Sequence, residues 1–222
     1  MGKMESKKVD KLVHKSGLVR REAMLLIPFL REPAREFTFA EIKEISRNKS
    51  HHYVFEALKK AVQLQILQEK RIGNTNIYFL EQKNKQNIQY LVFAESIAKE
   101  LKQGIQYTNI FRITEKIKNP FYILLIGGSY AEGRQKTGSD LDIAIIIPNS
   151  ESKKQYEIAL REGEFMIPEV HGYVFTQDEF YQMLVNDEFN YGKELVKKHI
   201  IFCGAEQYYS IVFEAIKNGF KS

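Results

Sequence analysis

The residues best suited to chemistry lie in the middle of the chain, between two short apolar stretches. Asp140 and Asp142 are two positions apart at the start of the second stretch, so in a strand both carboxylates point to one face. Neighbouring carboxylates repel each other unless a cation neutralises them, and hard divalent ions prefer oxygen ligands. Gly128 and Ser129 suit a tight turn whose backbone N–H groups approach an anion closely. A metal site beside a phosphate-binding turn indicates phosphoryl or nucleotidyl transfer.

Two predicted strands position these residues. Residues 121–125 and 143–147 are apolar and rich in β-branched side chains, and each stretch meets turn-forming residues at one end. This pattern is typical of buried strands. The alternative interpretation is a surface hairpin that carries two solvated aspartates.

The spacing of these residues resembles the signature of the nucleotidyltransferase superfamily related to DNA polymerase beta, especially its minimal members. Gly128-Ser129 is followed after three residues by Gly133, and after five more by Ser139-Asp140-x-Asp142. The resemblance is strong over residues 121–147 and loose over residues 105–203. It implies a domain in which a mixed sheet flanked by helices carries the site.

The resemblance also implies a reaction and a set of roles. An acceptor hydroxyl would attack the α-phosphorus of a nucleoside triphosphate, with ATP the expected nucleotide and pyrophosphate the leaving group. Two Mg²⁺ ions, with Mn²⁺ as the alternative, would be held by Asp140 and Asp142. The expected nucleotide-binding residues are Gly128, Ser129, Gly133 and Ser139. Of these, Ser139 is expected to orient the turn and not to take part in the chemistry.

The family uses a third carboxylate from a neighbouring strand, and Glu169 is the candidate. Residues 164–176 alternate as a strand does, and of the carboxylates after Asp142 only Glu169 falls inside this predicted strand. We therefore expect Glu169 near both aspartates, as a catalytic residue and metal ligand; a salt bridge or an edge-strand charge is its alternative role. His171 shares its face, either as a substrate contact or as a structural histidine. Glu132 stands where many relatives carry Arg or Lys, and Arg134 and Lys136 are the candidates to restore that charge.

The composition restricts where the protein works. No apolar run in the 222 residues is long enough to cross a membrane, the N-terminus lacks a signal-peptide core, and one cysteine excludes an internal disulfide. We expect a cytoplasmic protein without membrane contact. Residues 1–85 carry 18 Lys and Arg against 10 Asp and Glu, a net charge of +8, whereas the remainder carries 15 against 18, a net charge of −3. The basic N-terminal part suggests a nucleic-acid partner.

The N-terminal part predicts three helices and a hairpin. The helices are expected at residues 20–31, at 39–46 after the Thr38–Glu41 capping box, and at 51–63 after Ser50. Residues 66–72 and 76–80 flank a polar tip. This order resembles a winged helix-turn-helix domain, so we predict an α+β protein with a winged helix domain at 1–85 and a nucleotidyltransferase domain at 86–222. Residues 1–16 are polar and are expected to be frayed or weakly helical.

The rest of the second domain is predicted from periodicity and caps. Residues 200–202 are expected to form a short strand or an extended link, and Thr176 with Glu179 makes a second capping box. Helices are expected at residues 88–103, 107–118, 151–162, 177–185, 191–198 and 205–218.

The winged-helix resemblance implies duplex DNA as a partner. The third helix and the hairpin would supply the contacts, for which the candidates are His51, His52, Tyr53, Lys59, Lys60 and Arg71. The alternative is that this domain docks a protein or forms a homodimer.

Three functions are compatible with this sequence. The first is an active nucleotidyltransferase directed by its winged helix. The second is an antitoxin-like protein that adenylylates a small helical toxin-like partner and regulates its own operon. The third is a DNA-binding regulator whose transferase core only senses nucleotide, and the intact carboxylate pair argues against it.

Overall fold

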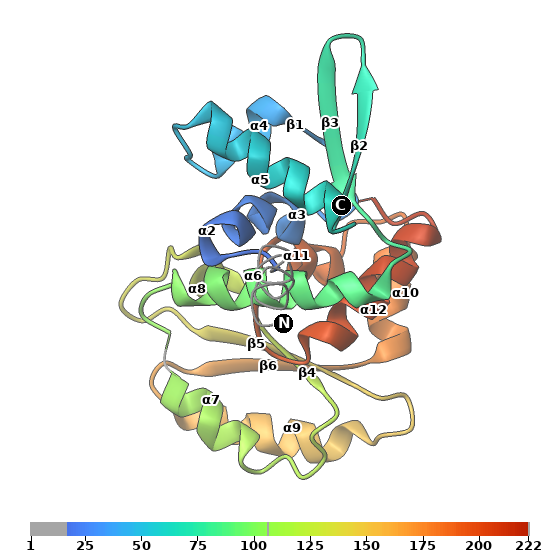
Figure 1. Ribbon diagram of the computed structural model, residues 1–222. Coiled ribbons are helices and arrows are strands. Elements are labelled where there is room, and N and C mark those ends of the chain that lie inside the picture. The colour runs from blue at the N-terminus through green and yellow to red at the C-terminus, as the bar shows by residue number, and fades with distance from the viewer. Residues whose placement is uncertain (1–16, 106, 222) are drawn as a thin grey trace, which may run out of the picture.

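The fold is α+β, as predicted from the sequence (Figure 1). The computed structural model describes residues 17–105 and 107–221, so the prediction for residues 1–16 lies outside the described residues. N-terminal helices with a three-stranded antiparallel sheet precede a mixed four-stranded sheet that is flanked by helices. Within the described ranges, no helix is long and apolar enough to cross a membrane.

The first predicted helix is present but is divided into three parts. Its parts are α2 (Arg20–Ala23), the 3-10 turn η1 (Met24–Leu26) and α3 (Ile27–Arg31). Pro28 lies at the start of α3. It has no backbone N–H to donate within a continuous helix, which explains why the helix is interrupted just before it.

Local capping chemistry sets the next helix starts, as predicted. Thr38 Oγ1 accepts a hydrogen bond of 3.2 Å from the Glu41 N–H, and Glu41 accepts one of 2.8 Å from the Thr38 N–H. Ser50 Oγ accepts from the Tyr53 N–H at 3.2 Å. The elements of this part are β1 (Phe37–Thr38), α4 (Phe39–Ile45), α5 (His51–Gln63), β2 (Leu67–Ile72) and β3 (Thr75–Leu80), with sheet order β1-β3-β2.

The second sheet has the order β6-β5-β4-β7, in which β5 and β6 are parallel and the other pairs antiparallel. Helices α7 and α9 lie on one face of it, and α6, α10, α11 and α12 on the other (Figure 1). The elements are η2 (Lys85–Asn87), α6 (Ile88–Glu100), α7 (Tyr107–Thr114), β4 (Ile123–Ile126), α8 (Gly128–Glu132), β5 (Leu141–Ile147), α9 (Lys153–Arg161), η3 (Glu162–Phe165), β6 (Val170–Thr176), α10 (Gln177–Val185), α11 (Tyr191–Lys197), β7 (Ile200–Cys203) and α12 (Ala205–Lys217).

One apolar core crosses the predicted division at residue 85. Buried side chains of the N-terminal helices pack with α6, with α12 and with one face of the second sheet in a single cluster that runs from Leu18 to Phe220. The other face of the sheet packs on α7 and α9 in a second cluster. The N-terminal elements therefore share their core with the second sheet.

A buried polar network lies inside this shared core. Glu95 of α6 accepts hydrogen bonds from the Tyr209 hydroxyl at 2.7 Å and from His199 Nε2 at 3.0 Å, and Arg31 Nη2 lies 3.6 Å from its second oxygen. His199 Nδ1 lies 2.7 Å from the Leu195 carbonyl oxygen. Both nitrogens of His199 thus face oxygen atoms, Nε2 the Glu95 carboxylate and Nδ1 the Leu195 carbonyl.

Two further predicted elements, both at the candidate site, differ from those observed. The predicted strand 164–176 begins only at Val170, because Pro168 cannot donate a ladder hydrogen bond and residues 162–165 form the turn η3. Glu169 therefore precedes the strand and does not lie in its middle. The predicted tight turn after β4 is the short helix α8.

Cys203 ends β7 on the opposite edge of this sheet. Its half-buried Sγ lies 3.9 Å from the Tyr122 carbonyl oxygen. Burial raises the pKa of the Cys203 thiol.

Candidate active site

Asp142 and Gly128 are in direct contact where β4 enters α8. The Gly127 N–H donates a 2.9 Å hydrogen bond to the Asp142 carbonyl, which ties the two strand ends together. Gly128 has φ +56°, and a Cβ atom at this position would lie only 1.9 Å from Asp142 Oδ2. Any side chain here would therefore be strained and would collide with the carboxylate. The Asp142 carboxylate consequently lies against the start of α8.

The surroundings of Asp142 disfavour its negative charge. Burial raises the pKa of this carboxyl, and the charges of Asp140 and Glu194 raise it further, while His171 acts in the opposite direction. A cation placed here would relieve this unfavourable electrostatic energy.

Asp140, Glu169 and His171 form a second group beside Asp142. One possible ligand atom of each side chain lies within 4.8 Å of the other two. Among the described residues, this is the group of three or more His, Cys, Asp or Glu side chains that meets this spacing. Their side chains are 45%, 52% and 47% exposed, respectively. Carboxylate and imidazole groups both bind divalent ions, so this donor set fits such an ion.

The parallel pairing of β5 with β6 brings these residues together. Leu141 pairs with Val170 and Asp142 with His171, and the Leu141 N–H donates to the Glu169 carbonyl at 2.8 Å. Glu169 is thus near Asp140, although both residues precede their strands. Asp142 is level with His171, and its carboxylate is turned toward Gly128.

Gly133 and Ser139 lie at turns. Gly133 ends α8 in the left-handed conformation, with φ +70°. Ser139 Oγ accepts from the Lys136 N–H at 2.9 Å and closes the loop before β5. Gly128 and Ser129 are the predicted nucleotide-binding residues at the start of α8, where Asp142 lies.

Glu132 is neutralised by two cations. It forms ion pairs with Arg134 and with Lys198, whose Nζ lies 2.9 Å away. Hydrogen bonds from Arg134 and Lys198 lower the pKa of the Glu132 carboxyl. Lys198, which sequence reasoning did not consider, thus brings positive charge to α8 from the end of α11.

Sequence reasoning also missed Tyr191 and Glu194 of α11. A Cβ on Gly127 would lie 3.4 Å from the Tyr191 hydroxyl. This hydroxyl is buried and has no hydrogen-bond partner among the described residues. Burial, and then the nearby Asp142 charge, raise the pKa of Tyr191. The three-residue spacing of Tyr191 and Glu194 on one helix face was the available signal, but only the fold shows which neighbours that face meets.

The predicted DNA contacts separate into two groups. His51, His52, Lys59 and Arg71 are exposed. Lys60 instead pairs with Glu22 at 2.7 Å. Tyr53 lies beneath the Arg21 guanidinium, 4.2 Å from the ring centroid. Tyr53 and Lys60 therefore face the protein, because partners from α2 hold their polar or aromatic groups.

Comparison with known proteins gives a match over part of the chain. No curated protein and no solved structure matches it. Residues 118–195 match the model of a family described as the nucleotidyltransferase domain. The match extends from just before β4 into α11, so it contains Gly128, Asp140, Asp142 and Glu169. The match supports the resemblance noted in the sequence over residues 118–195.

Proposed function

We propose that the protein transfers a nucleoside monophosphate from a nucleoside triphosphate, with ATP the expected donor, to the hydroxyl group of an acceptor. The observation that carries this proposal is the contact between Asp142 and the Gly128 turn, with Asp140 and Glu169 beside it. A turn that suits phosphate and a group of carboxylates that suits divalent ions then meet at one point, within a match to the nucleotidyltransferase domain.

Each part of the site has a role in this proposal. The backbone N–H groups of Gly128 and Ser129 and the Ser129 hydroxyl bind the β- and γ-phosphates. Asp140, Asp142 and Glu169 hold divalent ions, expected to be two Mg²⁺ with Mn²⁺ as the alternative. When bound, such ions neutralise phosphate charge and make the acceptor hydroxyl more acidic. Lys198 and Arg134 offset the charge of Glu132, so that α8 does not repel the triphosphate.

The reaction exchanges one phosphorus–oxygen bond for another. The acceptor oxygen forms a bond to the α-phosphorus, and the bond from that phosphorus to the bridging oxygen of the β-phosphate breaks. Pyrophosphate leaves with the bonding electron pair, and the hydroxyl proton passes to solvent.

Labelled nucleotides test this proposal directly. The protein is incubated with Mg²⁺ or Mn²⁺, cell extract and each nucleoside triphosphate, labelled in separate reactions at the α- or γ-phosphate. We expect the α-label in an acceptor and the γ-label in pyrophosphate; transfer of the γ-label to the acceptor would contradict nucleotidyl transfer. A small helical protein as the labelled acceptor would support the antitoxin-like alternative.

Matched variants connect this activity to the site. Asp140→Asn with Asp142→Asn should abolish α-label transfer, because neutral amides bind divalent ions poorly. Asp178→Asn makes the same chemical change in the first turn of α10, at the far end of β6, and should retain transfer. Equal activity of the double variant and wild type would refute the assignment.

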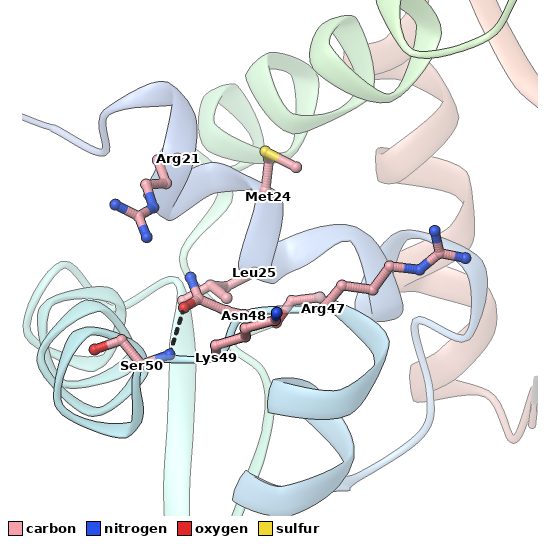
Figure 2. Close-up of a pocket in the computed structure, with 8 residues that line it drawn as sticks. Arg21, Met24, Leu25, Arg47, Asn48, Lys49 and Ser50 are labelled. Carbon is pink, nitrogen blue, oxygen red and sulfur yellow. Dashed lines mark hydrogen bonds between the residues drawn. The ribbon is translucent and has the colours of Figure 1, made fainter.

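We also propose that residues 1–85 form a winged helix-turn-helix domain that binds duplex DNA. In support, α4 and α5 precede a hairpin whose sheet includes β1. A cavity of about 450 Å³ lies between α2 and the α4–α5 turn, and its lining includes Arg21, Arg47 and Lys49 (Figure 2). The Arg21 and Arg47 guanidinium groups extend to opposite sides of this cavity (Figure 2). Lys59 of α5 and Arg71 of the hairpin are further exposed cations of this part of the chain.

The salt dependence of binding tests the DNA proposal. Affinity of the full chain for duplex DNA should fall steeply as salt rises, and Lys59→Ala should reduce the log–log slope by about 0.9 if this lysine contacts one phosphate. Lys60→Ala should leave the slope unchanged, because Lys60 is paired with Glu22. Absence of binding at low salt would favour a protein-docking role for this domain.

A further inference from the structure

His171 lies between the two carboxylates of the Asp140 group. Its Nδ1 is 3.8 Å from Asp140 Oδ2, and its Nε2 is 3.6 Å from Glu169 Oε1. Both distances are too long for direct hydrogen bonds. The imidazole thus faces two carboxylates without bonding directly to either.

Only one nitrogen of His171 can bind a given ion, and with one ligand atom taken from each residue the three groups lie within 4.8 Å of one another. Ligand atoms bonded at about 2.1–2.2 Å to a common ion, roughly 90–110° apart, lie about 3.0–3.6 Å from each other. Small side-chain rotations would bring the three groups to that spacing. About half of each side chain is exposed, so an ion can enter from solvent and keep some of its water.

The sheet holds His171 in this place. Asp142 and His171 are paired across β5 and β6. Glu169, two residues before His171, is fixed by its carbonyl oxygen, which accepts a hydrogen bond from the Leu141 N–H. Residues that are paired on neighbouring strands point to the same face of a sheet, so the imidazole projects on the same face as Asp142. His171 therefore belongs to the same group of side chains as the two aspartates.

We propose that His171 is itself a ligand of the divalent ion held by Asp140 and Glu169, and that it makes this position prefer Mn²⁺ to Mg²⁺. This inference rests on the proposed function, in which these carboxylates bind metal. Mg²⁺ strongly prefers oxygen ligands, whereas imidazole nitrogen suits first-row transition ions. A site in which only oxygen atoms bind the ion would lack this source of preference for Mn²⁺ over Mg²⁺.

Electron paramagnetic resonance of the full-length, metal-stripped protein tests the assignment without measuring activity. Titration with Mn²⁺ gives the affinity, competition by Mg²⁺ gives the preference, and pulsed spectra detect nitrogen bonded to the ion. We expect a nitrogen signal in wild type that is absent from His171→Gln. The affinity for Mn²⁺ should fall in this variant by at least the roughly tenfold that loss of a supporting partner costs.

His171→Asp is the matched variant, because it keeps a ligand but replaces nitrogen by oxygen. It should retain Mn²⁺ binding, lack the nitrogen signal and show a smaller preference for Mn²⁺ over Mg²⁺. Thermal unfolding of stripped His171→Gln should match wild type, since the side chain is half exposed. Stripped His171→Asp should unfold at a lower temperature, because its carboxylate would face those of Asp140 and Glu169.

The outcomes separate this inference from the function on which it rests. Mn²⁺ binding that requires Asp140 but shows no nitrogen signal, or a signal that persists in His171→Gln, would overturn the role of His171 and leave nucleotidyl transfer intact. Absence of any Mn²⁺ or Mg²⁺ binding, even with nucleoside triphosphate present, would overturn both.

Discussion

Asp142 combines a carboxylate, a strand end and a glycine contact at one point. Its Oδ2 occupies space that a side chain at position 128 would need, and its surroundings raise its pKa. Such a charge weakens the metal-free fold and at the same time favours cation binding. The same residue should therefore affect stability in opposite directions without and with metal.

Asp142→Asn should stabilise the metal-free protein at neutral pH, with a rise in Tm of roughly 1–3 °C. The sign follows from linkage: a folded-state pKa above the unfolded value means that ionisation disfavours the fold. The gain should therefore vanish below the unfolded pKa, where the carboxyl is protonated in both states.

Thermal unfolding across pH, with and without Mn²⁺, measures this effect. Mn²⁺ should raise the Tm of wild type more than that of the variant. Asp178→Asn should instead lower Tm slightly, because Asp178 lies in the first turn of α10. A metal-free Asp142→Asn variant less stable than wild type would contradict the argument.

The sequence predicted some of these residues better than others. Asp140, Asp142, Gly128 and Ser129 are close in sequence, so their grouping depends on one turn and two short strands. Tyr191 is 49 positions beyond Asp142, and its contact with the turn depends on how α11 packs. Glu169 was chosen for a position inside a strand, whereas it precedes β6 and lies near Asp140 through the pairing of β5 and β6.

Among the elements, α6 connects the N-terminal helices to the second sheet through Glu95. Burial alone would raise the pKa of this carboxyl, but the charges of Arg31 and His199 and the hydrogen bonds of His199 and Tyr209 hold it at about 2. A low folded-state pKa contributes stability that is present above the unfolded value near 4.5 and is lost as pH falls toward 2. The network therefore stabilises the junction at neutral pH.

Glu95→Gln should lower the free energy of unfolding by about 3–5 kcal/mol, because it leaves Arg31 and His199 without their buried counter-charge. Urea unfolding at pH 7 measures the loss. Glu100→Gln is the control on the same helix, since its ion pair with Arg20 is more than half exposed and is worth little. Similar losses in both variants would show that the network adds nothing specific.

The turn between α4 and α5 contains a strained residue. Arg47 has φ +51°, a left-handed conformation that costs an L-residue about 1 kcal/mol or more. Arg47→Gly should therefore raise stability by about 0.5 kcal/mol after the added backbone entropy of glycine is counted. It should also weaken DNA binding if Arg47 contributes to the proposed positive surface.

Urea unfolding and a DNA titration measure these two effects on the same variant. Gln65→Gly provides the control, because Gln65 has φ +55° at the opposite end of α5 and is uncharged. Its DNA affinity should stay at the wild-type value. If both variants weaken DNA binding equally, backbone flexibility and not the lost cation would be responsible.

For the whole molecule, the shared core predicts that both parts unfold together. Leu26 of the N-terminal helices is 1% exposed and belongs to the same cluster as Leu125 of β4. Calorimetry of the full chain should show one transition whose van't Hoff and calorimetric enthalpies agree. Leu26→Ala should shift this entire transition downward, by a loss of about 2–5 kcal/mol. Two separate transitions, of which only one responds to Leu26→Ala, would show independent domains.

The overall architecture was predictable where local chemistry decides it. The capping boxes of Thr38 and Thr176 marked helix starts that the structure confirms, and each depends on a Glu only three residues away. The shared core was not predictable, because contacts such as that of Glu95 with His199 join residues 104 positions apart. Composition suggested a boundary at residue 85, but it carries no information on packing across that boundary.

The burial of Cys203 makes the chain suitable for site-specific labelling. A half-buried thiol with a raised pKa contains little reactive thiolate at neutral pH, and the sequence has no second cysteine. A fluorophore reagent should therefore attach selectively to a new cysteine at the exposed hairpin tip, for example Asn74→Cys, without removal of the native one. The sequence also contains no tryptophan, so a single introduced tryptophan near α8 would complete a donor–acceptor pair that reports the distance between the hairpin and the candidate active site.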